Sequence, residues 1–405
     1  MSNINQDSSN LIHQLAQSRA YAFDSKTFSP EELVERCTGS LESYGFCVID
    51  NVIPTEEVPA ISQEILEAMK KIKQNIQAIE ELVDSKKFNE KELLESKKIQ
   101  LRSSGRQGRP AKPPNDIVWM PKYAQHLANS KVVKVASRLL DEHLRIVQLH
   151  PKFIPISSSD DASGISLGND LLGLPRIYKA PASARDWHTD WPHDPSAYGG
   201  DNPDENIGFM RQPYPDIVMC LVMIWYFSDV DEKSGGTWAV PGSHKDKRSP
   251  RGPSDGITLT APIPGEIQIK AKAGSVFIQD SRLWHSSPLF VTQKRVSVVN
   301  RWCPWWLSAD DYAPRSMYNA VCRPLSQSEF LALPTELQPL MRHLCPKELD
   351  TIQKPLLDRA KAAAERTRWA YQQLVKNAAN LAKANANIRV AVAPLKNKTK
   401  LKKNK

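Results

Sequence analysis

The segment AGSVFIQDSRLWHSSPLFVTQKRVSVVNRW, residues 273–302, carries the pattern that decides the fold. It contains two apolar runs, 276–278 and 296–300, which are rich in the β-branched residues typical of strands. His285 follows the first run and Arg295 opens the second. The sequence between them can turn the chain, so we expect antiparallel strands. These strands would bring an imidazole and a guanidinium to the same cavity.

Similar short apolar runs occur throughout the middle of the chain. Glycine, proline and aspartate clusters separate them, which favours a sandwich or jelly roll over alternating β/α units. The sequence predicts an all-β core with a double-stranded β-helix, that is, a cupin-like jelly roll. N-terminal helices would flank this core and a helical extension would follow it. The other expected strands are 46–49, 176–179, 217–227, 237–240, 257–259 and 267–270.

Three stretches have helical periodicity. Between 55 and 96, apolar residues recur at spacings of four and three, which predicts an amphipathic helix that packs on the domain or forms a short coiled coil. A second helix is expected over 124–142, and an alanine-rich one over 355–386.

The chain is expected to have four parts, with three insertions in the second. The insertion 192–216 begins two residues after Asp190 and is rich in proline, aspartate and glycine, so we expect a lid over the substrate or a surface excursion. The four parts are a helical lead-in (1–39), a jelly-roll domain (40–306), a C-terminal helical extension (307–390) and a disordered basic tail (391–405). The other two insertions in the jelly-roll domain are a helical segment (55–97) and a basic loop (103–116).

The formal net charge of +9 is concentrated at the C-terminus. The last ten residues contain six lysines and no acid, so removing them leaves a charge of +3 on the remaining chain. A body this close to neutral makes a nucleic-acid partner unlikely, because nonspecific duplex binding requires a basic face. The tail is therefore interpreted as a solvated end.

The sequence also bears on the cellular location. No run approaches the roughly 18 apolar residues of a membrane span, and the N-terminus lacks the features of a secretory signal. None of the six cysteines forms a C-x-x-C pair, so they are expected to be reduced core residues. We expect a cytoplasmic protein with no membrane partner; nothing in the sequence indicates its oligomeric state.

A candidate metal site arises from the run DWHTDW, which places His188 and Asp190 two residues apart. On a strand these positions face the same side, so their side chains can converge on one ion. With His285 they would form the two-histidine, one-carboxylate triad of non-haem Fe(II) oxygenases, which leaves three coordination positions open.

A second H-x-D pair, His244 and Asp246, is the alternative to the first. Asp246 precedes His285 by 39 residues, and this segment has room for only three plausible strands. Asp190 precedes His285 by 95 residues. A jelly roll needs about four strands between these elements. His244 also follows Pro-Gly-Ser, which is typical of a turn. We therefore favour His188 and Asp190.

Arg295 supplies a candidate anion site ten residues after His285. The planar guanidinium suits bidentate binding of the distal carboxylate of a diacid such as 2-oxoglutarate. On its own, an arginine at a strand start is usually a surface residue. Its combination with H-x-D, a spacing of several strands and a distal histidine is specific.

These residues lie in longer runs that resemble the phytanoyl-CoA dioxygenase-like family of Fe(II)/2-oxoglutarate oxygenases. The matching runs are YGFCVIDNVIP (44–54), WHTDW (187–191), IWYFSDVDEKSGGTWAVPGSH (224–244), AGSVFIQDSRLWHSS (273–287) and RVSVVNRW (295–302). The resemblance spans about two thirds of the chain. It implies neither a coenzyme A thioester as substrate nor a particular product.

The resemblance also implies roles for individual residues. His188, Asp190 and His285 would be the iron ligands and catalytic residues, and Arg295 would bind the side-chain carboxylate of 2-oxoglutarate. Ser287 matches a position that hydrogen-bonds this co-substrate. Trp225 matches an aromatic position that lines the same pocket, although a core aromatic is nearly as plausible there; Ser243 and His244 are interpreted as structural.

The predicted function is therefore that of an Fe(II)-, 2-oxoglutarate- and O₂-dependent dioxygenase that oxidises a small organic molecule. Hydroxylation is the favoured reaction, with desaturation, cyclisation and epimerisation as open alternatives. Two other functions are alternatives to this one: an inactive jelly-roll scaffold, and an oxygenase that acts on a macromolecule. The intact triad and Arg295 argue against the first, and the near-neutral body argues against the second.

Overall fold

The computed structural model describes most of the expected jelly roll. The chain divides into two compact units, residues 1–345 and 346–405. The basic loop 103–116, the strand 257–259, most of the insertion 192–216 and the basic tail lie outside the described residues. The structure describes residues 14–84, 117–154, 165–169, 175–178, 185, 187–190, 213–248, 250, 261–288, 291–307 and 325–345, with short helical pieces between 367 and 379.

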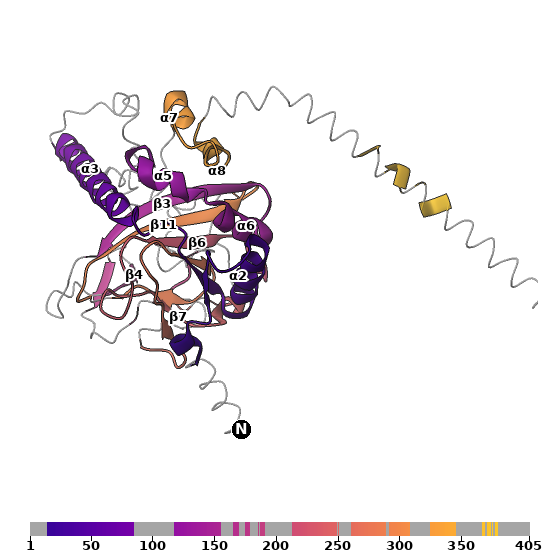
Figure 1. The fold of residues 1–405 in the computed structure, drawn as a ribbon, viewed down its shortest axis with the longest axis horizontal. Helices are drawn as coiled ribbons and strands as arrows, with labels where there is room; N and C mark the ends of the chain where they lie inside the picture. Colours follow the sequence, from indigo (N-terminus) through magenta and orange to yellow (C-terminus); the bar gives the residue numbers. More distant parts are fainter. Residues whose placement is uncertain are drawn as a thin grey trace, which may run out of the picture. The chain divides into compact units, whose positions relative to one another are not determined.

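A six-stranded sheet forms the centre of the first unit (Figure 1). Its order is β1-β2-β9-β6-β11-β3, and all neighbours are antiparallel except β1 and β2. The strands are β1 (Ala22–Asp24), β2 (Phe46–Asp50), β3 (Leu144–Ile154), β6 (Leu221–Tyr226), β9 (Val276–Asp280) and β11 (Arg295–Pro304).

A smaller sheet carries the distal histidine. Its order is β10 (His285–Ser286), β7 (Trp238–Ala239) and β8 (Ile267–Gln268), and a bridge from His188 to His285 adds the H-x-D segment beside β10. A separate two-stranded sheet consists of β4 (Ile165–Asn169) and β5 (Pro175–Tyr178). Two sheets with flanking helices confirm the predicted fold class.

Local signals explain how α2 (Pro30–Tyr44) delivers the chain into β2. Ser29 and Glu32 form a capping box, and Pro30 occupies the first helical position, where a missing N–H is harmless. Gly45 ends the helix in the left-handed conformation at φ 87°. A side chain there would be strained and would also collide with the ring of His244.

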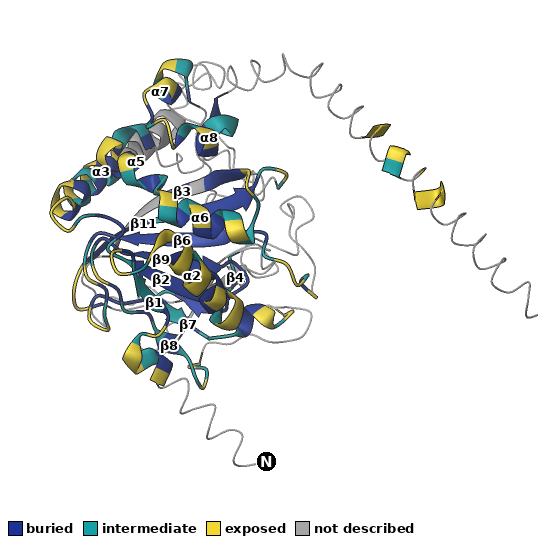
Figure 2. Ribbon diagram, turned by 45° about the vertical axis from the view of Figure 1, so that its right-hand side comes forward, coloured by how far each residue is buried: buried dark blue, intermediate teal, exposed yellow. Residues whose placement is uncertain are grey.

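Several helices cover the sheet. Figure 2 shows exposed faces on α2, α3 and α6, while the described strands of the main sheet are almost entirely buried. The helices are α3 (Val58–Asp84), α5 (Pro121–Leu127), α6 (Ser130–Leu139), α7 (Gln327–Leu331) and α8 (Gln338–Met341), with 3₁₀ turns at Ile117–Trp119, Ser243–Lys245 and Arg342–Leu344. No helix among the described residues is both long and apolar enough to span a bilayer.

Two expectations about secondary structure were wrong. The single helix expected over 124–142 is two helices, because the Asn129 side chain accepts a hydrogen bond from the Lys131 N–H and caps α6. Strand β3 was not expected, since it contains Pro151 and polar residues. Among the described strands, β3 pairs with β11 alone and lies at the edge of the sheet, where a proline is tolerated.

The two faces of the main sheet bury different apolar cores. One core lies on the helix side and includes Met223, Trp225 and Val298. The other lies between the main sheet and the smaller sheet and includes Ile224, Tyr226 and Phe277. We call the second side of the main sheet the inner face.

The C-terminal part of the first unit also joins the helix-side core. Residues 325–345, which we expected in the helical extension, contribute Phe330, Leu337 and Met341 to that core. The expected boundary at 306 therefore falls within this compact unit. The domain limits remain predictions.

Candidate active site

The backbone brings His188 and His285 side by side. The His188 N–H donates to the His285 carbonyl and the His285 N–H donates to the His188 carbonyl, each at 3.0 Å. The ring centroids lie 4.3 Å apart. This reciprocal pair of hydrogen bonds fixes two histidines that are almost a hundred residues apart in sequence.

Asp190 completes the group. Its N–H donates to the Ser281 carbonyl at 2.8 Å, which anchors the segment just before β10. Donor atoms of His188, Asp190 and His285 lie within 4.8 Å of one another. In the part of the chain that the structure describes, this is the one cluster of histidine, cysteine and carboxylate groups that could hold a metal ion.

The hydrogen bonds of His285 fit a cation at this site. The Leu283 carbonyl lies 2.9 Å from Nδ1; because a carbonyl can only accept, Nδ1 carries a proton. The other ring nitrogen, Nε2, faces Oδ2 of Asp190 at 3.2 Å. A ring nitrogen and a carboxylate oxygen this close together can ligate one ion, and such ligands suit Fe(II).

The charge state of Asp190 also suits a metal. Burial on its own would raise the pKa of this carboxyl, but the charge of Arg301 and the two nearby histidines outweigh it. Together they hold the pKa of Asp190 well below its ordinary value. Asp190 therefore supplies a carboxylate at neutral pH.

Arg295 is a buried cation that lacks a carboxylate partner among the described residues. Its side chain is 2% exposed, Nη1 donates to the Gly235 carbonyl, and Nε has no hydrogen-bond partner. Burial lowers the pKa of this guanidinium, and the nearby Tyr226 opposes that shift. A buried positive charge is costly unless an anion pairs with it, so the residues present fit the distal carboxylate of 2-oxoglutarate.

Strand alternation places further polar groups beside Arg295. Ser297 follows two positions later on the same face, and its buried hydroxyl has no hydrogen-bond partner. Tyr226 lies opposite Ser297 across β6 and β11, and its buried hydroxyl faces Thr237 and the charge of Arg295. The inner face near Arg295 thus has unused hydrogen-bonding capacity for a small polar molecule.

Trp225 does not join this group, contrary to the sequence-based expectation. It packs edge-on against Tyr123 at a centroid distance of 5.8 Å, in the helix-side core. Successive strand residues alternate between faces, so its neighbour Tyr226 is the aromatic of the inner face. Ser287 is half-buried one residue beyond β10; its predicted role remains a prediction.

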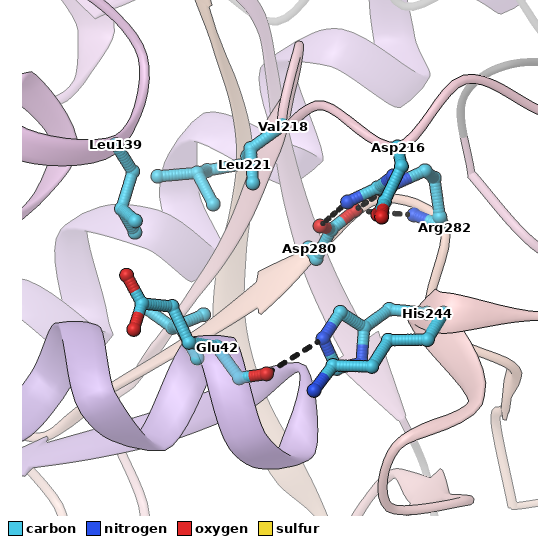
Figure 3. Close-up of a pocket in the computed structure, with 10 residues that line it drawn as sticks. Glu42, Leu139, Asp216, Val218, Leu221, His244, Asp280 and Arg282 are labelled. Carbon is cyan, nitrogen blue, oxygen red and sulfur yellow. Dashed lines mark hydrogen bonds and ion pairs between the residues drawn. The ribbon is translucent and has the colours of Figure 1, made fainter.

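The alternative pair, His244 and Asp246, is held elsewhere. Nε2 of His244 donates to the Glu42 carbonyl at 3.3 Å, and Asp246 pairs with Arg248 at 2.7 Å. Figure 3 shows His244 in a cavity of about 260 Å³ between α2, α6 and the end of β9. This cavity also contains the buried Asp280–Arg282 ion pair but none of the three residues of the metal cluster.

Sequence reasoning missed two residues that contact Asp190. Arg301 reaches its Oδ1 at 2.6 Å from β11, and Gln279 reaches its Oδ2 at 3.2 Å from β9. Counting in steps of two from Arg295 would have placed Arg301 on the same face. Gln279 had no comparable signal.

Comparison with protein families supplies the assignment. The Phytanoyl-CoA dioxygenase (PhyH) family model matches residues 41–296, well over half of the 405 residues. The chain belongs to this family. It is therefore a 2-oxoglutarate-dependent non-haem iron enzyme, with iron and 2-oxoglutarate as cofactor and co-substrate. The predicted family, enzyme class and cofactors are confirmed, which sets aside the inactive scaffold.

Solved structures of other proteins are similar to this chain at low identity. Apo HygX from Streptomyces hygroscopicus has a TM-score of 0.39 and 15% identity, covering 67% of this chain and 87% of its own. HygX with nickel and 2-oxoglutarate bound has a TM-score of 0.38, with 16% identity and the same coverage. The non-haem α-ketoglutarate-dependent epimerase SnoN from nogalamycin biosynthesis has a TM-score of 0.35 and 15% identity, covering 68% and 84%. At these scores the assignment rests on the family match alone. A comparison with curated proteins gave no match.

Proposed function

We propose that this protein is a dioxygenase that hydroxylates a small organic molecule. His188, Asp190 and His285 would hold Fe(II), and Arg295 would bind the distal carboxylate of 2-oxoglutarate. The observation that carries the proposal is the placement of Nε2 of His285 and Oδ2 of Asp190 3.2 Å apart, within one cluster of potential ligands.

Each residue has a defined task in this proposal. Three protein ligands leave three positions for 2-oxoglutarate and O₂. When bound, iron supplies the oxidation that is coupled to conversion of 2-oxoglutarate to succinate and CO₂. Arg295 orients 2-oxoglutarate by a charge-assisted, bidentate contact. The apolar side chains of Ile224 and Phe277 would limit water on the inner face of the sheet.

Hydroxylation of a small molecule is favoured over epimerisation and over a macromolecular substrate. It is the simplest outcome once a substrate C–H bond lies near the metal, whereas epimerisation requires a particular substrate geometry. The near-neutral body of the chain argues against nucleic acid. We also propose that the protein works in the cytoplasm.

The test is turnover of 2-oxoglutarate by the purified protein. Fe(II), 2-oxoglutarate and a metabolite library would be incubated with the wild-type protein and with His188→Ala, and succinate release would be followed. We expect some metabolites to stimulate succinate release by the wild-type protein alone, with a product heavier by one oxygen atom. A product of unchanged mass from stimulated turnover would contradict hydroxylation, and equal turnover in His188→Ala would contradict the site.

A further inference from the structure

The Asp190 carboxylate is held on both of its oxygens by the main sheet. Oδ1 accepts from Nη2 of Arg301 at 2.6 Å, and Oδ2 accepts from Nε2 of Gln279 at 3.2 Å. We propose that Arg301 and Gln279 are positioning residues that fix the orientation of this carboxylate. The inference rests on the proposed role of Asp190 as an iron ligand.

The two residues belong to one row across three strands. Val222 on β6 is in register with Gln279 on β9 and with Arg301 on β11. Arg301, Val222 and Gln279 therefore share the inner face at the same height in the sheet. The Asp190 carboxylate contacts both ends of this row, so the most regular part of the fold determines its orientation.

The two contacts differ in strength, and this difference distinguishes the two oxygens. The Arg301 contact is a short, charge-assisted hydrogen bond between groups that are largely buried. The Gln279 contact is longer and neutral, and its oxygen is the one that faces His285 at 3.2 Å. Oδ1 is therefore engaged by the ion pair, while Oδ2 is directed to His285.

This asymmetry matters because a free carboxylate can bind a metal through one oxygen or through both. Binding through both would leave only two open positions on a six-coordinate ion. A site for 2-oxoglutarate and O₂ needs three. By engaging Oδ1, Arg301 restricts Asp190 to one ligand atom and preserves the third position.

Arg301 also lies beyond the family match, which ends at residue 296. Its position six residues after Arg295 puts both arginines on the inner face of β11. Arg295 remains available for the co-substrate, while Arg301 is committed to a protein ligand of the metal.

The test compares Arg301→Met with Arg301→Lys, using Co(II) as the probe metal. The visible absorption of Co(II) reports the number and arrangement of its ligands. We expect Arg301→Met to change the Co(II) spectrum before any co-substrate is added. The affinity of the Co(II)-loaded variant for 2-oxoglutarate should fall by about 10–100-fold, as for other contacts that orient metal ligands. Arg301→Lys should restore part of both properties.

Two further variants separate positioning from loss of fold. Arg19→Met breaks an Arg–Asp pair at the opposite edge of the sheet, where Arg19 contacts both oxygens of Asp50, and should leave spectrum and affinity unchanged. Gln279→Met removes the other contact without removing a charge. It should change both properties in the same direction, by less than Arg301→Met, and it keeps the test valid if Arg301→Met does not fold.

The possible failures are distinguishable. If the wild-type protein binds no Co(II), or if His188→Ala binds it equally well, the proposed function fails. If Arg301→Met and Gln279→Met both keep the wild-type spectrum and affinity, only the positioning role fails. If affinity falls while the spectrum is unchanged, Arg301 contacts 2-oxoglutarate directly, which also overturns the positioning role.

Discussion

The two ends of the inner face of β11 carry the same residue type in opposite circumstances. Arg301 is 6% exposed and lies 2.6 Å from the Asp190 carboxylate. Arg295 is 2% exposed, and no described carboxylate pairs with it. One arginine completes a protein site, while the other leaves a positive charge to be neutralised from solution. Burial alone therefore does not tell a structural arginine from a binding one; its partners do.

The largest expected effect comes from the metal cluster next to Arg301. His188→Ala, Asp190→Ala and His285→Ala should each abolish 2-oxoglutarate turnover, because two protein ligands hold Fe(II) weakly. Metal content and succinate release would be measured together. His244→Ala is the control and should keep both. Near wild-type turnover in His188→Ala with loss of metal in His244→Ala would show that the other H-x-D pair is the site.

The next-largest effect tests whether the two arginines differ in their contribution to stability. In metal-free protein, Arg301→Met should lower the free energy of unfolding by about 3–5 kcal/mol, because it leaves the Asp190 carboxylate without its main partner. Arg295→Met should cost far less, since no described carboxylate loses its partner. Urea denaturation of both variants measures the difference. Equal losses would mean that the two arginines have equivalent surroundings.

At the other end of the strand, Arg295→Lys should weaken co-substrate binding. A point charge replaces a planar fork, and the expected loss is about 1.5–3 kcal/mol, the scale of a hydrogen bond to a charged group. The KM for 2-oxoglutarate would be compared with that of Arg19→Lys, which alters an arginine remote from the site. An unchanged KM in Arg295→Lys would show that Arg295 does not bind 2-oxoglutarate.

The smallest expected effects come from variants on the two faces of β6. Trp225→Phe should lower stability by roughly 1–3 kcal/mol through loss of core packing, with no change in the KM for 2-oxoglutarate. Tyr226→Phe should do the reverse, with a modest rise in that KM and little loss of stability. A changed KM for 2-oxoglutarate in Trp225→Phe alone would show that Trp225 lines the co-substrate pocket.

Part of this picture could be predicted from the sequence. The spacing of two residues was sufficient to group His188 with Asp190, and the spacing to His285 favoured them over His244. The expected strand is not present, because His188 forms a single bridge and Asp190 lies in a turn. The face of Trp225 could not be predicted, because all six residues of β6 are buried and show no polar alternation. The pairing of Arg301 with Asp190 depends on strand order, which local patterns do not encode.

The most direct test of the account is calorimetric titration of 2-oxoglutarate into Co(II)-loaded wild-type protein and into Arg295→Met. The account predicts that the wild-type protein binds 2-oxoglutarate only when Co(II) is present, and that Arg295→Met retains Co(II) but loses most of this affinity. Both requirements follow from a metal held at one end of the inner face and, at the other, a buried guanidinium that no described carboxylate pairs with. Binding of 2-oxoglutarate that needs neither Co(II) nor Arg295 would contradict it.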